Sequence, residues 1–175
     1  MLFRSVEFRL DSDADSAAPV AVAETDWVLA GGGGRIVRIP ASFGAVFGVP
    51  ELPLEMHRVA AAPPPEPAPA AIRLAVRYAE VDPNGHLNNA VHLDWLDEAV
   101  IAADGAADLG RFPRRYGAEY LQALQLGVGS TVAAWRDADS SGWHGTITRD
   151  DGVVAGRRSE EHTSELQSHL NLVCR

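Results

Sequence analysis

The alternation of apolar and polar residues predicts short β-strands in both halves of the chain. Val6, Phe8 and Leu10 alternate with Glu7 and Arg9, which is the period of a half-buried strand. The same pattern predicts further strands at 20–29, 35–39, 72–78, 114–121, 131–137, 143–149 and from 153 onward. Clusters of Gly, Asp and Ser between them predict turns, with a glycine hairpin at 31–34. A short helical turn is expected at 41–48.

One segment has the helical period instead. Asn88 and Asn89 are good N-cap residues, and no Gly or Pro follows before Gly105. Apolar residues recur on one side at helical spacing, joined by Trp95 and Ala99: Leu93, Leu96, Val100 and Ala103. An acidic face lies opposite: Asp94, Asp97, Glu98 and Asp104. One amphipathic helix among short strands predicts an α+β fold, an antiparallel sheet wrapped around the helix at 89–104, with a partial second sheet from 6–39 beside it.

The chain divides into modules at a Pro/Ala-rich stretch. Residues 60–71 have the composition of a semi-extended linker. Both flanking halves contain a strand, an Asp/Ser-rich turn, a Trp-bearing strand, a Gly turn and a final strand. The first half has no counterpart of the strand and helix at 72–104. We therefore expect 1–59 to be the C-terminal part of a first module, truncated at its N-terminus, and 72–157 to be a nearly complete second module.

The segment 158–175 differs in composition from everything before it. The upstream chain is rich in Ala, Arg and Gly, whereas this segment uses Ser, Glu, Gln, Asn and Leu. It resembles the in-frame translation of a sequencing-library adapter. We expect a non-native tail with no defined packing. The alternative is a native amphipathic C-terminal helix.

Composition and charge exclude several classes of protein. The chain has 175 residues, 46% of them hydrophobic and 22% charged, as in a globular protein. The formal net charge is -9 and all 15 basic residues are Arg, so there is no basic stripe for nucleic acid. No apolar run approaches the ~20 residues of a membrane span, and the N-terminus lacks a signal-peptide pattern. The single cysteine, Cys174, cannot form an internal disulfide, so a cytoplasmic location is expected.

The candidate chemistry lies in the loop before the helix. Asp82, Asn84 and His86 stand at alternate positions there. An Asp near a His can orient the ring and favour a general base near neutral pH. Asn84 can hydrogen-bond a carbonyl group or hold a water. The start of the helix offers N–H groups and a partial positive charge to a developing oxyanion. These are the parts needed to hydrolyse an acyl bond without a serine nucleophile.

Other interpretations of these residues remain open at this point. The loop could be only a polar turn, capped by Asn88, in which Asp82 and His86 satisfy each other. A zinc site is disfavoured because His86 and His92 lie on a loop and a helix and do not share a face. No Gly-x-Ser-x-Gly elbow supports a serine hydrolase. The glycines at 31–34 lie between two strands, which disfavours a phosphate site.

The segment from Arg77 to Trp95 resembles the hot-dog thioesterases, in particular the acyl-acyl-carrier-protein (acyl-ACP) thioesterases. Their motif is Asp-x-Asn-x-His-x-Asn-Asn followed by an aromatic residue and a Trp on the central helix. The matching residues in this chain are Asp82, Asn84, His86, Asn88, Asn89 and Trp95. The resemblance implies two hot-dog modules in one chain, with the active site in the second.

The resemblance also implies roles and a substrate. Asp82 would be the nucleophile or the base that orients water, and Asn84 and His86 would position and polarise the reacting groups. The helix N-terminus would bind the thioester oxygen, and Asn88, Asn89 and Trp95 would bind substrate; no metal and no cofactor are expected. The implied reaction is hydrolysis of long-chain acyl-ACP to free fatty acid in fatty-acid biosynthesis. The partner is the acyl carrier protein, and a homodimer is one candidate assembly.

Two departures from the family pattern bear on mechanism. His92 stands where the family usually has Tyr. The plant enzymes have a Glu-Cys pair on the strand after the helix, and the aligned residues here are Ala123 and Leu124. Glu119 cannot replace that Glu, because four residues along a strand span ~13 Å. A cysteine-dependent mechanism is therefore not expected.

Three other functions compete with this one. The first is an acyl-CoA thioesterase of the 4-hydroxybenzoyl-CoA type, which shares the Asp…Gly-His-x-Asn-Asn loop but is usually a single module. The second is a non-catalytic hot-dog protein that binds acyl thioesters, which would not need the Asp82 and His86 pair. The third is an inactive chain, because roughly one and a half modules leave sheet edges and apolar faces uncovered.

Overall fold

The computed structural model describes most of the second half of the chain and parts of the first. The described residues are 2–8, 21–27, 37, 40, 42, 46, 59, 62–66, 69–111, 114–136, 142–162 and 169–174. The elements in chain order are β1 (Leu2–Phe8), β2 (Ala21–Trp27), β3 (Ala71–Ala75), the 3-10 helix η1 (Tyr78–Glu80), α2 (Asn89–Ala102), α3 (Ala106–Leu109), β4 (Arg114–Tyr120), β5 (Gly129–Arg136), β6 (Trp143–Arg149), β7 (Val154–His162) and β8 (His169–Cys174).

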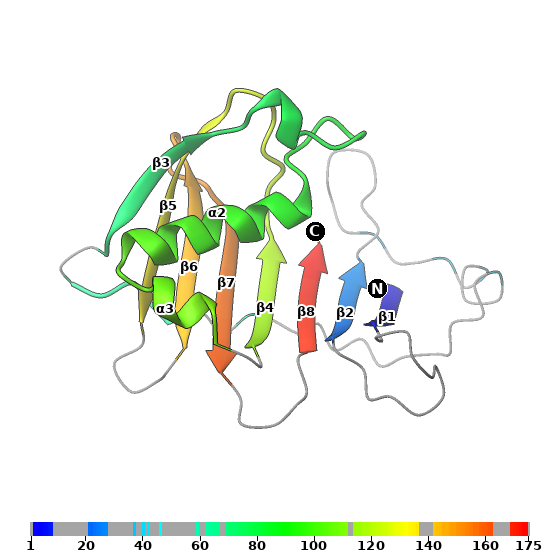
Figure 1. The fold of residues 1–175 in the computed structure, drawn as a ribbon. Coiled ribbons are helices and arrows are strands. Elements are labelled where there is room, and N and C mark those ends of the chain that lie inside the picture. Colours follow the sequence, from blue (N-terminus) through cyan, green and yellow to red (C-terminus); the bar gives the residue numbers. More distant parts are fainter. Residues whose placement is uncertain are drawn as a thin grey trace.

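All of these strands belong to one sheet, which α2 covers on one face (Figure 1). The strand order is β1-β2-β8-β4-β7-β6-β5-β3. The five strands from β4 to β3 pair antiparallel with one another, and α2 packs mainly against β5, β3 and β6. A five-stranded antiparallel sheet wrapped around one long helix is the hot-dog fold, so the α+β prediction is confirmed.

The helix forms where the sequence predicts it, but its buried face is rotated relative to the predicted apolar face. Asn88 caps α2 by accepting the N–H of Ala90 at 2.9 Å. The buried residues of α2 are His92, Trp95, Leu96, Ala99 and Val100, whereas Leu93 and Ala103 are only half-buried. His92 lies against Tyr120 of β4 and Gly156 of β7, so a polar ring enters the helix–sheet interface.

Two glycines set how closely the helical segment approaches the sheet. A Cβ at Gly145 of β6 would stand 2.7 Å from the Leu96 side chain, so only glycine lets α2 lie this close. A Cβ at Gly105 would stand 2.3 Å from the Trp143 ring, which packs where the chain leaves α2. The core around these contacts consists mainly of aliphatic and aromatic side chains: Val76, Leu87, Trp95, Leu96, Val100, Leu124, Val132, Ala134, Trp143 and Ile147.

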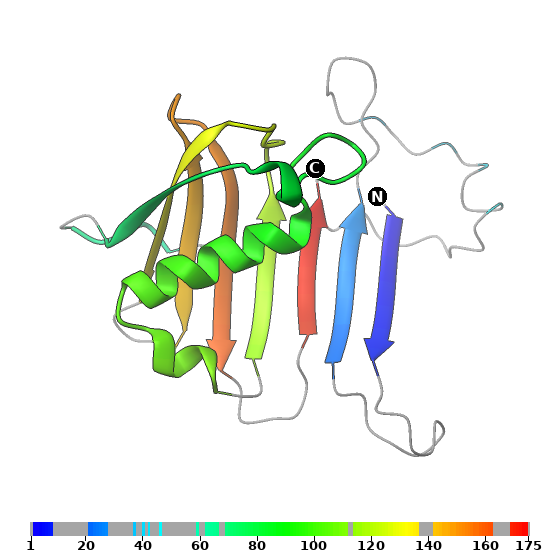
Figure 2. The same ribbon diagram turned by 45° about the horizontal axis from the view of Figure 1, so that its top comes forward.

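The prediction of a separate second sheet is wrong. β1 pairs antiparallel with β2, and β2 pairs parallel with β8, which joins both strands to the edge of β4 (Figure 2). Of the strand expected at 35–39, only Val37 is described, and it is exposed and outside any strand. Ser42 and Val46 are helical, as expected for 41–48. The described linker residues, 62–66, 69 and 70, contain no helix or strand.

The prediction that the chain has no defined packing from Arg158 onward is also wrong. β7 continues through this point and pairs with β4 as far as Arg114↔His162. Arg158 and Glu160 are each 1% exposed, and both face the α2 side of the sheet. Glu160 accepts hydrogen bonds from Arg114 Nε at 2.6 Å and from Arg158 Nη2 at 2.7 Å, and Arg158 also pairs with Asp97. Because each buried charge has a partner of opposite sign, β7 can continue past Arg158 into the protein interior.

Candidate active site

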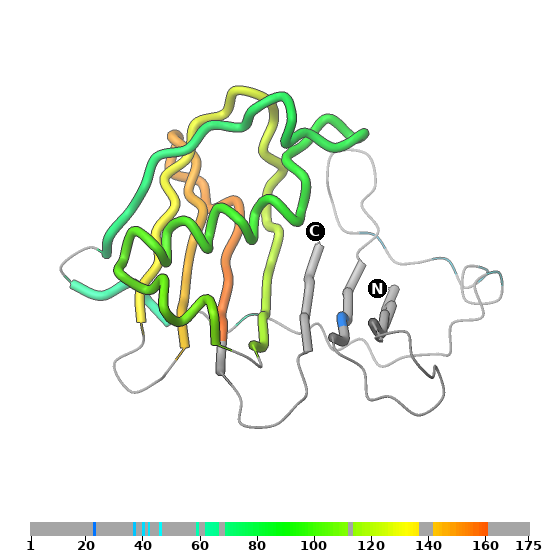
Figure 3. Tube along the Cα trace, in the orientation of Figure 1, coloured from blue at the N-terminus to red at the C-terminus, as the bar shows by residue number. Residues whose placement is uncertain are grey.

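The loop between β3 and α2 is tied to the rest of the fold at both ends (Figure 3). Val81 and Leu87 form an antiparallel bridge across the loop, and His86 forms another with Gln125. The Leu87 N–H donates to the Leu124 carbonyl at 2.7 Å. Between these ties the chain reverses at Gly85, whose φ of 81° favours glycine. The loop residues therefore have a defined place beside the start of α2.

The Asp82 carboxylate turns into the loop itself. One oxygen accepts the backbone N–H of Asn84 at 2.8 Å and that of His86 at 3.2 Å, and the other accepts the Asn84 side-chain amide at 3.2 Å. Burial opposes ionisation of this group, but the N–H donors of His86 and Asn84 outweigh it and lower the pKa of Asp82. The structure thus brings Asp82, Asn84 and His86 together around an ionised carboxylate.

Asp82 accepts its hydrogen bond from the His86 backbone N–H and not from the ring, and the ring adds a Coulombic attraction that helps to lower the pKa of Asp82. The hydrogen bond to His86 comes from its main-chain N–H, because the loop reverses between the two residues. The His86 ring is half-buried and has no hydrogen-bond partner among the described residues.

Glu80 supports the loop and was missed by the sequence analysis. Its carboxylate is only 6% exposed and accepts the Arg77 backbone N–H and Nε, each at 2.8 Å, as well as Arg77 Nη2. The Trp95 indole N–H lies 3.5 Å from the same carboxylate. The hydrogen bond from Arg77 is the main cause of the lowered pKa of Glu80. The only sequence signal was the i, i+3 spacing of Arg77 and Glu80.

The first turn of α2 does not present a row of unpaired N–H groups, contrary to expectation. The Ala90 N–H donates to the Asn88 side chain, and the Val91 and His92 N–H groups donate to the Asn88 carbonyl at 3.0 and 3.3 Å. Asn88 is the reason, because its side chain and its carbonyl both point along the helix start. A thioester oxygen could bind the Ala90 N–H only by displacing the Asn88 side chain.

Two aromatic rings hold the first turn from the sheet side. The Tyr120 hydroxyl donates to the Asn89 carbonyl at 2.9 Å, and His92 Nδ1 lies 3.2 Å from the Asn88 carbonyl. The two rings meet edge to face, with centroids 5.0 Å apart. The motif asparagines are thus fixed by β4 as well as by the helix.

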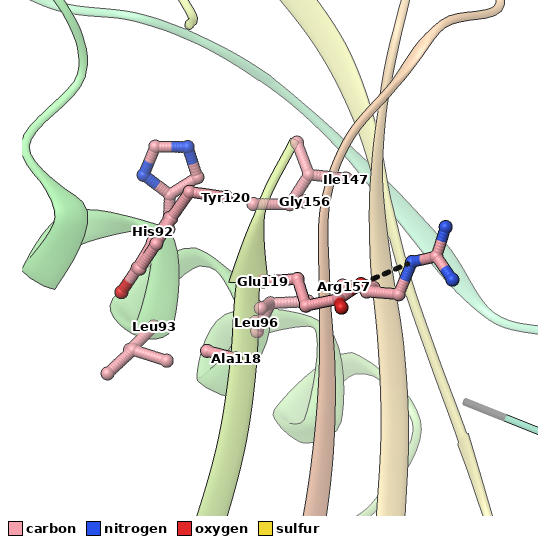
Figure 4. Close-up of a pocket in the computed structure, with 9 residues that line it drawn as sticks. All are labelled: His92, Leu93, Leu96, Ala118, Glu119, Tyr120, Ile147, Gly156 and Arg157. Carbon is pink, nitrogen blue, oxygen red and sulfur yellow. Dashed lines mark ion pairs between the residues drawn. The ribbon is translucent and has the colours of Figure 1, made fainter. Parts of the chain in front are cut away.

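A small pocket lies beside these rings, between α2 and the sheet (Figure 4). It has about 170 Å³ of empty space, including space open to solvent. Its walls include His92, Leu93 and Leu96 of α2 and, from the sheet, Tyr120, Ile147 and Gly156. In Figure 4 the His92 ring stands at one end and the Arg157 guanidinium extends away at the other. The pocket therefore adjoins the helix turn that carries the motif.

The remaining residues named from the family pattern lie apart from the loop carboxylate. Glu119 is buried, accepts the Val59 N–H at 3.3 Å and pairs with Arg157 at 3.4 Å. It alternates with Ala118 and Tyr120, so it points to the sheet face away from α2. Ala123 is exposed beside Leu124, whose carbonyl binds the loop. Trp95 is a core residue.

Neither a metal site nor a membrane span is found in the described part of the chain. No group of three or more His, Cys, Asp or Glu side chains there is placed to hold a metal ion. No helix among the described residues is long and apolar enough to cross a bilayer.

Comparison with known families identifies the segment that carries the loop. Residues 66–108 match the family model described as the acyl-ACP thioesterase C-terminal domain. The matched residues include β3, the loop and α2. A search of curated proteins gave no match.

Several solved structures are similar to this chain. The hypothetical protein SAV2348 from Staphylococcus aureus in complex with CoA is 20% identical, with 56% of this chain and 81% of that chain covered and a TM-score of 0.44. A thioesterase from Thermus thermophilus complexed with coenzyme A and Zn is 24% identical, with 56% and 82% covered and a TM-score of 0.43. The DHNA-CoA thioesterase from Staphylococcus aureus is 20% identical, with 52% and 70% covered and a TM-score of 0.42.

Proposed function

We propose that the module at 72–157 hydrolyses acyl thioesters on acyl carrier protein, releasing free fatty acid in fatty-acid biosynthesis. The observation that carries the proposal is the Asp82 carboxylate, ionised and held by N–H donors at the start of α2. It lies within the residues that match the acyl-ACP thioesterase domain. The setting would be the cytoplasm, with a homodimer as one candidate assembly.

In this proposal the loop residues divide the chemistry between them. In one route Asp82 attacks the thioester carbon, the carbon–sulfur bond breaks to give an acyl anhydride on Asp82, and water then hydrolyses the anhydride to the free acid. In the other route Asp82 or His86 takes a proton from a water that attacks the same carbon, and the carbon–sulfur bond breaks. In both routes the proton lost by the water goes to the leaving thiolate, so the carrier leaves as a thiol. The place of His86 in the same loop, with its ring close enough to attract the Asp82 carboxylate, supports a role in contacting the reacting groups, and Asn84 supports the carboxylate. Asp82 and His86 remain alternatives for the attacking or activating role.

Asn88, Asn89 and Trp95 would contribute around this centre. Asn88 would release the Ala90 N–H so that it can bind the thioester oxygen. Asn89 is held by Tyr120, which fixes the direction of the helix start. Trp95 is buried, so we assign it an indirect role through Glu80. These assignments make Asn88 the residue whose side chain has to move when substrate binds.

The size of the pocket limits how a long acyl chain can bind. Its 170 Å³ counts all space between the atoms, open solvent included, and none of that space has room for a water molecule. We therefore propose that the acyl chain lies outside this pocket.

The test is steady-state hydrolysis of a long-chain acyl-ACP by the full chain and its variants. Asp82→Asn or His86→Ala should lower kcat by ~10²-fold or more, with a smaller effect on KM. Asp94→Asn, on the exposed side of α2, is the matched control and should behave as wild type. Equal activity in all variants would mean that the loop is only a capped polar turn without a catalytic role. The same assay with acyl-CoA determines which carrier is preferred.

A further inference from the structure

The segment that follows β4 places a glutamine beside His86. His86 and Gln125 form an isolated antiparallel bridge, and the Leu87 N–H donates to the Leu124 carbonyl at 2.7 Å next to it. This hydrogen bond joins the flanking residues, so His86 and Gln125 are a non-hydrogen-bonded pair, in which the Cα atoms stand ~4.5 Å apart and the side chains lie closest. The side chains of such a pair project from the same face. Gln125 therefore extends alongside His86.

The main chain around Gln125 is held in place, whereas its side chain is exposed. The Gln125 carbonyl accepts the Val128 N–H at 3.1 Å, in a turn that passes through Gly127 at a φ of 78°. The Gly127 N–H donates to the Val76 carbonyl at 2.9 Å, which ties the turn to the residue after β3. The backbone thus fixes where the amide begins, and the amide can reach a bound molecule.

His86 lies between Gln125 and Asp82. The Asp82 N–H donates to the His86 carbonyl at 2.8 Å, and the next residue, Leu87, bonds to Leu124 on the other side. Three short segments of chain therefore run side by side. They contribute a carboxylate, an imidazole and an amide in that order.

The proposed reaction needs a donor for the thioester oxygen, which the start of α2 does not offer directly. Attack on the carbonyl carbon moves negative charge onto that oxygen, and hydrogen-bond donors aimed at it stabilise the transition state. The Ala90 N–H is already bonded to the Asn88 side chain at 2.9 Å. The Asp82 carboxylate, being ionised, can only accept. A glutamine amide carries two N–H donors and no charge, so it can fill this need without rearrangement of the helix start.

We propose that Gln125 is a further catalytic residue, whose side-chain amide donates a hydrogen bond to the carbonyl oxygen of the thioester. The inference rests on the proposed function and deepens it by adding an oxyanion donor from the segment after β4. Gln125 transfers no proton. Its hydrogen bond strengthens while the oxygen carries the negative charge and weakens when the carbonyl forms again and the carbon–sulfur bond breaks.

The first test is hydrolysis of a long-chain acyl-ACP by the full chain and the variant Gln125→Met. Methionine keeps the length and neutrality of the side chain but has no donor. The value of kcat should fall by about 10²-fold, as for the loss of one oxyanion donor, with little change in KM. Because an amide does not titrate, the same factor should appear at every pH. Gln122→Met, at an exposed glutamine of the same segment outside the bridge, is the matched control and should keep the wild-type rate.

A thermal melt excludes a merely structural effect. Both variants replace an exposed side chain, so both should unfold at the wild-type temperature. A wild-type rate in Gln125→Met, together with a loss in Asp82→Asn, overturns the role of Gln125 and leaves the proposed function standing.

A second test measures the hydrogen bond itself and does not depend on hydrolysis. The ligand is an acyl pantetheine in which a methylene replaces the sulfur and the ketone carbon is carbon-13. The infrared band of this carbonyl group should lie at lower frequency on the wild type and on Gln122→Met than on Gln125→Met, because a donated hydrogen bond weakens the C=O bond. This difference without hydrolysis supports Gln125 and rejects the proposed activity. Equal bands in all three chains overturn the role of Gln125, and a ketone that does not bind overturns both.

Discussion

Removal of the Glu80 carboxylate should destabilise the fold more than removal of an exposed one. The variant Glu80→Ala deletes the acceptor of the Arg77 backbone N–H and of the Trp95 indole N–H. The Arg77 guanidinium is largely exposed and can return to water, so its share is small. A buried donor left without an acceptor costs about 1–3 kcal/mol. The Trp95 indole N–H is buried and the Arg77 backbone N–H is partly buried. We therefore expect Glu80→Ala to lower the free energy of unfolding by about 2–3 kcal/mol.

Urea unfolding and a thermal melt measure this loss. For a chain of this size, a loss of that order lowers Tm by roughly 5–10 °C. The matched control is Glu98→Ala, which removes an equal charge from the exposed side of α2 and should change stability by less than about 0.5 kcal/mol. Equal losses in the two variants would refute the argument, since they would mean that the Glu80 contacts do not form.

The dependence on pH provides a second readout for Glu80. Its pKa in the folded chain lies below the ordinary value of 4.5, chiefly because of the hydrogen bond from Arg77. A lowered folded-state pKa means that the stabilisation is complete above pH 4.5 and disappears as the pH falls through the folded-state value. The difference between wild type and Glu80→Ala should therefore be large at neutral pH and smaller at about pH 3.5. A difference that does not change with pH would contradict an ionised Glu80.

Three further substitutions test the fold around the site by urea unfolding. Gly85→Ala, at a positive φ with no neighbour within 4 Å of a Cβ, should cost about 1–2 kcal/mol by strain alone, and Gly110→Ala, at a negative φ, should be nearly neutral. Gly105→Ala should cost about 1–3 kcal/mol, because its Cβ would overlap the Trp143 ring. Glu160→Gln should lower the free energy of unfolding by about 3 kcal/mol or more, because it removes the negative charge that two buried guanidinium groups share. An unchanged urea midpoint would support a tail without defined packing.

The strand, loop and helix that carry the motif could be predicted from the sequence alone. Helix α2 begins after Asn88, as the N-cap rule predicts, and ends at Ala102, just before Gly105. The strands of the second module also lie near their predicted positions, because period-two alternation is a local property. The family motif placed Asp82, Asn84 and His86 in one loop for the same reason, since they are neighbours in the chain.

The directions of the side chains were decided by tertiary structure. Asp82 binds main-chain N–H groups because the loop reverses at Gly85, and Glu119 points away from α2 because of its register in β4. The burial of His92 depends on Tyr120 and Gly156, which are distant in sequence. Glu160 could join the fold only because Arg114 and Arg158 meet it across the sheet. Local pattern specifies which elements form, whereas partners brought together by long-range packing determine which polar atoms face a pocket.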